Sequence, residues 1–420
     1  MSKLSRADRT ARARGGRARA RFDPFSAPFR SDPHASYRRL RRTDPVHWGV
    51  PPIPRLDGSW YVFRYADVAA GLKDPRLVRE PQRMAVESSL PPAPASIRPY
   101  CDLVRRWMLF RDPPEHERLR SLLGLVFTPR RVQELEPEIE AIAHELLETL
   151  ARQREVDLME AFALPFPVVV IARLLGLPLD DRDRLRGWSR TLVDAIDLRQ
   201  DDGGLEAAAQ TAQELDEYVR AIVRERRRHP RADVISALSE LCTRGLMDED
   251  EVVATSALLI FAGHETTVNL LGNGVLALLR HPRELAKLRA RPELWHSAVE
   301  ELLRFDGPAQ LTFRFAGEDL RIGEREVRRG QSVALVLASA NRDPEAFPNP
   351  DRLDVERNGV RHLGFGLGIH FCLGAALARS EARIALSALA RAAPRLELAG
   401  EPVWRPGIAL RSLERLPVRV

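Results

Sequence analysis

The sequence predicts a mainly α-helical protein with a minor β part, folded as one domain. Apolar residues recur at helical spacing through most of residues 129–298, whereas alternating or β-branched runs are confined to two shorter regions. The composition, with 44% hydrophobic and 30% charged residues, is ordinary for a globular protein with a sizeable core. No internal repeat and no linker rich in Gly or Ser divides residues 22–420, so we expect a single domain there.

Residues 1–21 are predicted to be a disordered basic tail, because they hold almost nothing apolar to bury. They contain Lys3, seven arginines and one acidic residue, Asp8, and so carry a net charge of +7. Since the whole chain carries +6, the remaining residues carry −1. The basicity therefore belongs to the tail, and we expect no nucleic-acid-binding function for the body of the protein.

The compartment predicted from the sequence is the cytoplasm. No apolar segment of a secretory signal follows the basic residues, and no uninterrupted apolar run is long enough to cross a membrane. The three cysteines, Cys101, Cys242 and Cys372, are far apart and odd in number, so a disulfide framework is not expected.

The predicted elements begin with a strand that turns into a helix within WYVFRYADVAAGLKDP. Residues 79–100 are proline-rich and lack periodicity, which indicates a long loop. Helices then fill most of residues 129–298, with breaks at GLPLDDRDR and QDDGG. Short strands are expected over residues 311–353, and the last long helix is LGAALARSEARIALSALARAA.

The least generic stretch is FGLGIHFCLG, residues 365–374. It is not a dinucleotide-binding loop, because Phe371 stands where the third glycine is needed, and no phosphate-binding lysine lies near. Zinc needs several clustered ligands, and Cys372 has no cysteine close in sequence. A nucleophilic cysteine stays possible, but it needs a base and an oxyanion site. The other role is a single thiolate bound to haem iron, which brings its remaining ligands with it.

A haem ligand explains the residue types around Cys372. A position at the start of a helix favours a thiolate. Amides around Leu373 and Gly374 are expected to donate hydrogen bonds to the sulfur. The glycines are expected to let the backbone pass close under a flat macrocycle, and Phe365 and Phe371 are expected to keep water away.

The stretch matches F-G-x-G-x-[HR]-x-C-x-G, the haem-binding signature, at every fixed position. The sequence therefore resembles the cytochrome P450 family, and the other family motifs follow in order across almost the whole chain after the tail. The resemblance implies the cytochrome P450 fold, with a long central helix over the haem and a small β-sheet region. It also implies haem b (iron protoporphyrin IX) as cofactor, Cys372 as the iron ligand, and Phe365 and Gly374 beside the haem.

An apolar helix is predicted through LLIFAGHETTVNLLGNGVLALLR, beginning near Asp248 and Glu251, which have capping-box spacing. Polar residues within such a buried helix are costly unless they have partners or a function. The adjacent Glu265 and Thr266 place an acid beside an alcohol.

This segment resembles the family's A-G-x-[DE]-T oxygen-binding groove. The resemblance implies that Ala262 and Gly263 lie against the cofactor, that Thr266 steadies dioxygen, and that Glu265 relays protons. His264 fills the variable position and is interpreted as structural.

In EELLRF, Glu301 and Arg304 are three residues apart and share a helix face. They could form an exposed ion pair that contributes little stability. The spacing resembles the buried E-x-x-R motif of the family, which a later arginine joins. FPNPDRLD supplies Arg352 as the candidate, and we assign these three residues to structural support of the haem pocket.

In DPPEHERLR, His116 and Arg120 are four residues apart and can point the same way from a helix, whereas Arg118 should point elsewhere. Haem carries two propionates, which need cationic or hydrogen-bonding partners. By resemblance His116, Arg120, Arg314 and His370 have that role.

The predicted function is that of a haem-thiolate monooxygenase, which inserts one oxygen atom from O₂ into an apolar small molecule by hydroxylation or epoxidation. A natural product or a lipid-like compound is expected, with Leu258, Phe261 and Leu311 lining the pocket and residues 79–100 and 192–198 above it. A ferredoxin and a ferredoxin reductase are the expected electron donors. The alternatives are a peroxide-driven or non-oxygenating haem-thiolate enzyme and a haem-based sensor or binding protein. The pair Glu265 and Thr266 argues against both.

Overall fold

The structure is a computed structural model that describes residues 22–26, 29, 32–51, 56–80, 94–197, 202–359 and 361–420. The predicted basic tail lies outside the described residues, as does most of the predicted loop over residues 79–100. The part of that loop nearest its end is helical, because α4 begins at Arg98.

Helices make up most of the described chain. Their bounds are α2 Pro33–Thr43, α3 Tyr65–Lys73, α4 Arg98–Arg105, α5 Glu115–Val126, α6 Pro129–Leu150, α7 Pro165–Leu175, α8 Arg182–Ile196, α9 Asp202–Arg228, α10 Val234–Thr243, α11 Glu249–Arg280, α12 Pro282–Ala290, α13 Trp295–Asp306, α14 Leu337–Ala340 and α15 Ala375–Ala392.

The strands are short and form small sheets. Their bounds are β1 Val46–Gly49, β2 Ser59–Val62, β3 Leu77–Val78, β4 Glu155–Asp157, β5 Thr312–Ala316, β6 Leu320–Ile322, β7 Arg325–Val327, β8 Ser332–Leu335, β9 Glu397–Leu398, β10 Val403–Trp404, β11 Leu413–Arg415 and β12 Pro417–Arg419. The largest sheet has the order β1-β2-β8-β5-β3, in which β2 and β8 are parallel and the other pairs antiparallel.

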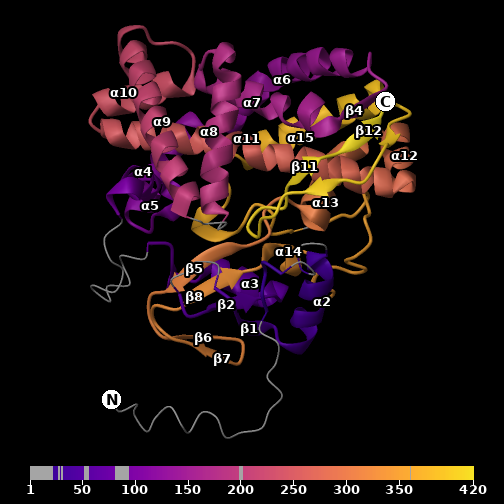
Figure 1. The fold of residues 1–420 in the computed structure, drawn as a ribbon, viewed down its shortest axis with the longest axis horizontal. Coiled ribbons are helices and arrows are strands. Elements are labelled where there is room, and N and C mark those ends of the chain that lie inside the picture. The colour runs from indigo at the N-terminus through magenta and orange to yellow at the C-terminus, as the bar shows by residue number, and fades with distance from the viewer. Residues whose placement is uncertain are drawn as a thin grey trace, which may run out of the picture.

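The helices and the largest sheet occupy different parts of the molecule. Figure 1 shows most helices gathered in a larger part around α11, and the sheet with α2, α3 and α14 in a smaller one. A continuous apolar core runs through the helical part, and two smaller clusters lie around the sheet. The prediction of a mainly α fold with a minor β part is confirmed.

Helix α11 is the central element, and a capping box fixes its beginning. The Asp248 side chain accepts the backbone N–H of Glu251 at 2.6 Å, and the Glu251 carboxylate accepts the N–H of Asp248 at 3.0 Å. This reciprocal pairing satisfies two of the free N–H groups at a helix start. The helix has 32 residues and spans roughly 48 Å at about 1.5 Å per residue. It contacts α7, α9, α13 and α15 and so connects most of the helical core.

The C-terminal strands β9–β12 were not predicted. Each has only two or three residues, too few to show the alternation by which a strand is recognised in sequence. Long-range pairing forms them instead, since β12 pairs with both β4 and β9.

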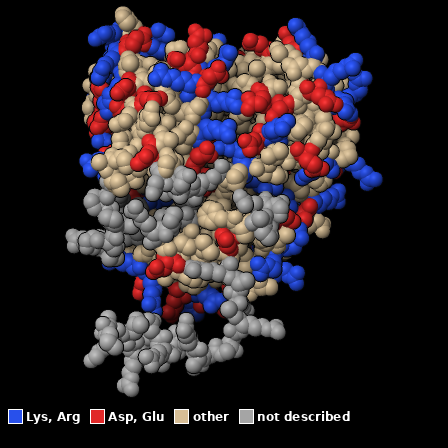
Figure 2. Space-filling model, viewed as in Figure 1, with Lys and Arg blue, Asp and Glu red and all other residues tan. Residues whose placement is uncertain are grey.

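Charged side chains of both signs are interspersed over the face shown in Figure 2. This mixture agrees with the near-zero net charge of residues 22–420. No helix in the described part of the chain has the length and apolar composition that a bilayer span requires.

Candidate active site

The Cys372 loop reaches the start of α15 through two tight turns. Gly366 and Gly368 have φ values of 72° and 75°, in the left-handed region that favours glycine. A methyl group on Gly368 would lie 2.8 Å from the carbonyl oxygen of Leu72, so this glycine also lets the loop lie against α3. The backbone N–H of Cys372 donates to the carbonyl of Phe365 at 3.0 Å, which closes the loop.

The thiol of Cys372 experiences opposing effects. Desolvation by the surrounding chain raises its pKa, whereas the backbone N–H of Gly374 and the charges of Arg120 and Arg379 lower it. A hydrogen bond from Gly374 to the sulfur is the interaction expected from the sequence. Desolvation is the largest effect, and on balance the pKa of the thiol is raised; the Gly374 N–H and the two arginines act in the other direction, toward the thiolate that binds a metal.

The two phenylalanines of the loop have different environments. Phe365 is partly buried, and the guanidinium of Arg379 lies 4.5 Å from its ring centre. Phe371 is 37% exposed and Ile369 is 46% exposed. Phe371 therefore does not exclude water as predicted, because its ring lies at the surface; the loop instead presents two apolar side chains to solvent.

A cationic cluster lies beside the loop. The rings of His116 and His370 are 4.3 Å apart. His116 is 1% exposed, and neither of its nitrogens has a hydrogen-bond partner in the described part of the chain. Burial, together with the charges of Arg79, Arg314 and Arg120, lowers the pKa of His370 to about 2. The four residues predicted to bind propionates are thus brought together.

Within the described residues no carboxylate lies within salt-bridge distance of the cluster arginines, although the charge of Asp112 acts on Arg79 and Arg314 from farther away. Arg314 is 3% exposed, and its guanidinium donates to the hydroxyl of Thr312 and to the backbone carbonyl of Phe313. Arg120 donates to the carbonyl of Phe371 at 2.8 Å. Buried cations without partners are unfavourable, so this cluster fits the two anionic propionates of a haem.

Arg79 is a member of the cluster that sequence reasoning missed. Its Nε is buried and has no hydrogen-bond partner among the described residues, and its pKa is lowered well below the usual value by burial and by the charge of Arg314. Asp112 accepts the backbone N–H groups of Arg79 and Glu80, which fixes this segment beside α5. The sequence offered no signal, since Arg79 begins an aperiodic segment of an arginine-rich chain.

Arg118 lies on another face of α5, as its spacing predicted. Its guanidinium pairs with Glu115 and with Glu251 at the start of α11. It therefore links two helices and is not part of the cationic cluster.

The middle of α11 is buried except at three partly exposed residues. Every residue from Val252 to Leu278 is buried except Ala262, Gly263 and Thr266. Ala262 and Thr266 are four residues apart on one face, and the hydroxyl of Thr266 donates to the carbonyl of Ala262 at 3.3 Å. An alcohol thus lies on the partly exposed face of an otherwise buried helix.

Glu265, beside this alcohol, is 5% exposed and pairs with Arg405 at 3.1 Å. His264 is structural, as interpreted from the sequence, since its Nδ1 lies 2.7 Å from the carbonyl of Ile260 one turn earlier. The small size of Gly263 has a packing reason, because a methyl group there would lie 2.6 Å from the Cδ1 of Ile171 on α7.

The three predicted pocket residues are all buried, with Leu258 and Phe261 on α11 and Leu311 just before β5. The ring of Phe261 stacks on Trp107 with centres 5.0 Å apart. Leu311 packs in the aromatic cluster that contains Phe29 and Tyr37. Their role as a pocket lining stays a prediction.

Glu301 and Arg304 form the E-x-x-R pair as predicted, but the prediction that Arg352 joins them is wrong. Arg304 contacts both carboxylate oxygens of Glu301, at 2.6 and 2.8 Å. The further arginine on Glu301 is Arg357, whose Nε donates at 3.1 Å. Arg352 is exposed and contributes only its backbone carbonyl, which accepts from both arginines. The physical reason is the turn after Pro350, which directs the Arg352 side chain outward and returns Arg357 to the buried carboxylate.

A cysteine thiol at the head of a helix, a cluster of unpaired cations beside it and a long helix with an acid and an alcohol define a haem-thiolate protein. The residues present fit the group: Cys372 would bind the iron, and the cationic cluster would bind the propionates.

Comparison with known proteins gives the family. A family model described as Cytochrome P450 matches residues 104–392. The biotin biosynthesis cytochrome P450 of Bacillus subtilis (strain 168) is 39% identical over 394 residues, which cover 94% of this chain and 97% of that protein. The polyketide biosynthesis cytochrome P450 PksS of the same organism is 38% identical over 403 residues, covering 94% and 98%.

The crystal structure of P450BioI in complex with hexadec-9Z-enoic acid ligated acyl carrier protein has a TM-score of 0.87 and 39% identity, covering 94% of this chain and all of that one. The chain therefore belongs to the cytochrome P450 family and is a haem-thiolate monooxygenase.

Proposed function

We propose that the protein oxygenates an apolar, chain-like small molecule of the fatty acyl or polyketide type, by hydroxylation or epoxidation. The observation that carries this proposal is the open strip on α11, the partly exposed face formed by Ala262 and Thr266, with Glu265 next to Thr266 in the chain. The names of the relatives support the substrate class, since they refer to biotin biosynthesis, polyketide biosynthesis and a bound hexadec-9Z-enoic acid.

The proposed form of the cofactor is haem b, which when bound supplies the chemistry of oxygen activation. Cys372 holds it through the iron. Arg79, Arg120 and Arg314, with the two histidines of the cluster, hold its propionates. Among the described residues the Nε of Arg79 and both ring nitrogens of His116 are buried without a hydrogen-bond partner, which supports this proposal.

Protons and electrons must both be supplied. Oxygenation with O₂ takes two electrons and two protons, leaves one oxygen atom in the product and releases the other as water. Thr266 is suited to hold a hydrogen bond at the open strip, and Glu265 is the acid that can pass protons toward it. A sensor that only binds a ligand needs no such pair.

The proposed electron donors are a ferredoxin and its reductase. The Cys372 loop reaches the surface at Ile369 and Phe371. A donor that docks there approaches the thiolate side of the site. Apolar side chains at the centre of a contact and charged ones around it are usual for docking surfaces.

The test is oxygenation in ¹⁸O₂ with hexadec-9Z-enoic acid and polyketide macrolactones as probes, first screened by the spectral shift that substrate binding causes in the haem. With a ferredoxin, its reductase and NADPH, we expect a product that carries one ¹⁸O atom. Product formed only with added hydrogen peroxide would support the peroxide-driven alternative. Binding of probes without any product under either condition would support the sensor.

A further inference from the structure

Arg405 connects the acid of the active site to another helix. Its Nη1 lies 3.1 Å from the Oε1 of Glu265 on α11, and its Nη2 lies 2.7 Å from the Oδ1 of Asp194 on α8. The side chains of Arg405 and Glu265 are 11% and 7% exposed, whereas that of Asp194 is 40% exposed. One guanidinium thus joins a buried carboxylate to one that reaches the surface.

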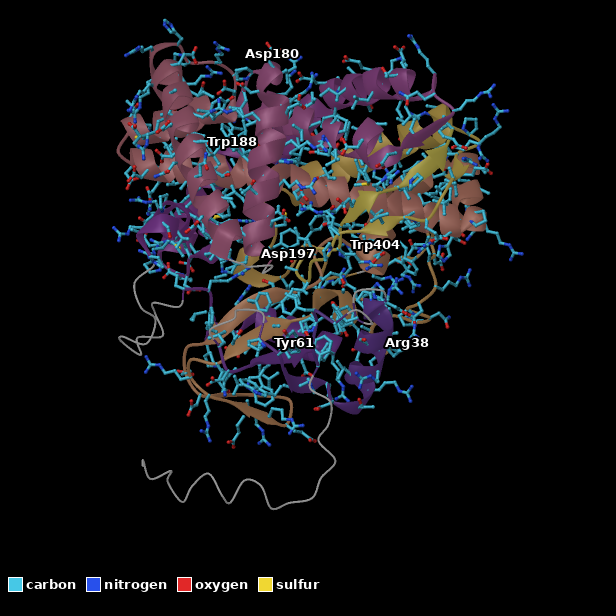
Figure 3. All side chains as sticks on the ribbon, in the orientation of Figure 1. Arg38, Tyr61, Asp180, Trp188, Asp197 and Trp404 are labelled. Atoms are coloured by element: carbon cyan, nitrogen blue, oxygen red, sulfur yellow. The ribbon has the colours of Figure 1, made fainter. Side chains whose placement is uncertain are left out.

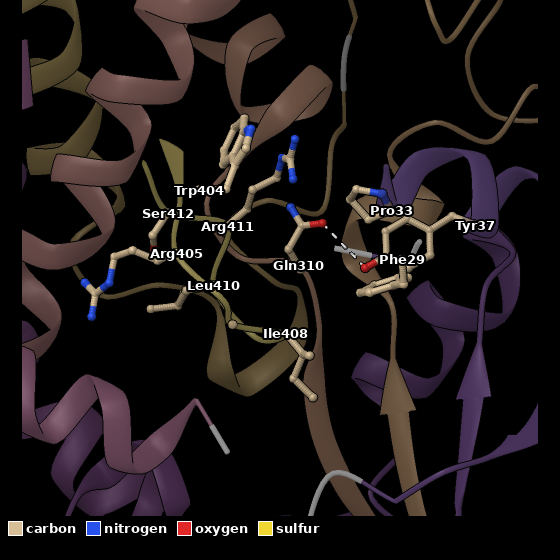
Figure 4. Close-up of a pocket in the computed structure, with 11 residues that line it drawn as sticks. Phe29, Pro33, Tyr37, Gln310, Trp404, Arg405, Ile408, Leu410, Arg411 and Ser412 are labelled. Carbon is tan, nitrogen blue, oxygen red and sulfur yellow. Dashed lines mark hydrogen bonds between the residues drawn. The ribbon is translucent and has the colours of Figure 1, made fainter. Parts of the chain in front are cut away.

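The loop between β10 and β11 holds Arg405 in place. Its backbone N–H donates to the carbonyl of Ser412 across this hairpin at 2.9 Å. Figure 4 shows the Arg405 side chain pointing away from Gln310 and Tyr37, which line the small pocket at the base of the same hairpin. The guanidinium is therefore directed to the helices and not to this pocket.

A second contact fastens the end of α8 to the same hairpin. Asp197, at the end of α8 nearest the sheet region (Figure 3), accepts the backbone N–H groups of Ile408 and Ala409 at 3.0 and 2.6 Å. A side chain on Gly407 would collide with this carboxylate. The hairpin and the end of α8 therefore form one hydrogen-bonded unit around Arg405.

We propose that Arg405 is a positioning residue for oxygenation: it fixes the orientation of the Glu265 carboxylate and ties that orientation to the position of α8. The proposal rests on the proton-relay role proposed for Glu265. Arginine suits this function, because its planar fork binds two carboxylates at once, whereas lysine has a single charged centre. Without Arg405, Glu265 is a buried carboxylate with no fixed direction.

The test compares turnover driven by O₂ with turnover driven by hydrogen peroxide. Peroxide brings its own two protons and two electrons, so it bypasses the relay. Variants are purified with haem, and a reduced carbon-monoxide spectrum and a thermal midpoint confirm that each is folded. Oxygen consumption with ferredoxin, reductase and NADPH is measured with hexadec-9Z-enoic acid present, in H₂O and in D₂O.

For Arg405→Gln we expect the ratio of O₂-driven to peroxide-driven turnover to fall roughly 10²-fold, with a larger solvent isotope effect, since misplacing one relay group has an effect of this size. For Arg405→Lys we expect a smaller fall in this ratio than for Arg405→Gln. Asp194→Asn removes the charge that Arg405 contacts on α8 and should raise KM more than it lowers kcat. Glu414→Gln removes the Arg190 ion pair between α8 and β11 and is the matched control. It should leave the turnover ratio, KM and kcat at their parental values.

Three outcomes would overturn the proposal. If both Arg405 variants keep the parental ratio while Glu265→Gln loses it, the relay role of Glu265 stands and Arg405 is structural only. If Glu265→Gln keeps the parental ratio as well, the proposed role of Glu265 itself is wrong. Equal losses in O₂-driven and peroxide-driven turnover for Arg405→Gln would also contradict positioning.

Discussion

Glu301 and Arg304 are joined by two hydrogen bonds, 2.6 and 2.8 Å long, and both side chains are fully buried. The remaining N–H groups of Arg304 donate to the backbone carbonyls of Asn341, Pro350 and Arg352. The pair therefore organises the segment that leads from β8 to the Cys372 loop. We therefore expect this contact to support the active site structurally and to take no part in the chemistry.

Substitution at this pair should be strongly destabilising. Glu301→Gln leaves Arg304 as an uncompensated buried charge, and we expect it to lower the free energy of unfolding by about 3–5 kcal/mol and to reduce haem incorporation. Arg357→Ala should lower the free energy of unfolding more than Arg352→Ala does, because of these two side chains it is that of Arg357 that contacts Glu301. Urea unfolding of the two variants checks this, and equal stabilities would show that Arg357 is not the third member.

Glu300, the neighbour of that pair, gives an expected pH dependence. Burial alone would raise its pKa, but hydrogen bonds and charges from His362 and Arg379 outweigh this and lower the pKa to about 2. A depressed pKa contributes stability above the ordinary value near 4.5, and this stability is lost as pH falls from about 4.5 toward 2.

In Glu300→Gln the fall in stability over this pH range should therefore be less steep, by up to about 1.4 kcal/mol per pH unit. Urea unfolding at pH 6, 4.5 and 3.5 measures it. The parent and the variant should differ in slope only below pH 5, and parallel curves throughout would contradict the assignment.

Cys372 is expected to be the iron ligand. Cys372→Ser should abolish the thiolate-type spectrum of the reduced carbon-monoxide complex, because an alcohol oxygen does not replace a thiolate. Cys101→Ser and Cys242→Ser are matched controls and should keep that spectrum, since neither lies in the Cys372 loop. Retention of the spectrum in the Cys372 variant would show that another residue binds the iron.

The sequence was sufficient to predict those parts of the site whose residues lie close together in the chain. The Cys372 loop, the capping box of α11 and the E-x-x-R pair each depend on residues within one short segment, so their spacing alone predicts their geometry. Arg405 could not be found in this way, because it lies 140 positions from Glu265 and meets it only through the C-terminal hairpin. Arg357 and Arg352 stand in one irregular loop, where no periodicity indicates which side chain turns inward.

Arg79 should contribute to haem retention. Arg79→Ala removes one cation from the cluster, and we expect haem to transfer to apomyoglobin about tenfold faster, since a charged hydrogen bond contributes about 1.5–3 kcal/mol. Arg76→Ala is the control, because Arg76 is exposed and pairs with Asp74. Equal transfer rates for parent and Arg79→Ala would place Arg79 outside the haem site.

Substitution of Glu265 and substitution of Thr266 on α11 should impair catalysis in different ways. Neither residue is expected to hold the haem, so Thr266→Ala and Glu265→Gln should keep full haem content and a normal carbon-monoxide spectrum. Loss of the Thr266 hydroxyl removes a hydrogen bond at the open strip, so electrons should still be consumed but more should end as hydrogen peroxide and less as product. Glu265→Gln should slow oxygen consumption itself, because the amide cannot pass a proton.

Parallel assays of NADPH, peroxide and product separate these two effects. A matched control is Thr267→Ala, since Thr267 is buried next to the pair and does not face the open strip. It should couple electrons to product as the parent does. If Thr266→Ala and Glu265→Gln also couple as the parent does, both residues are structural, and the main argument against the sensor and the peroxide-driven enzyme is lost.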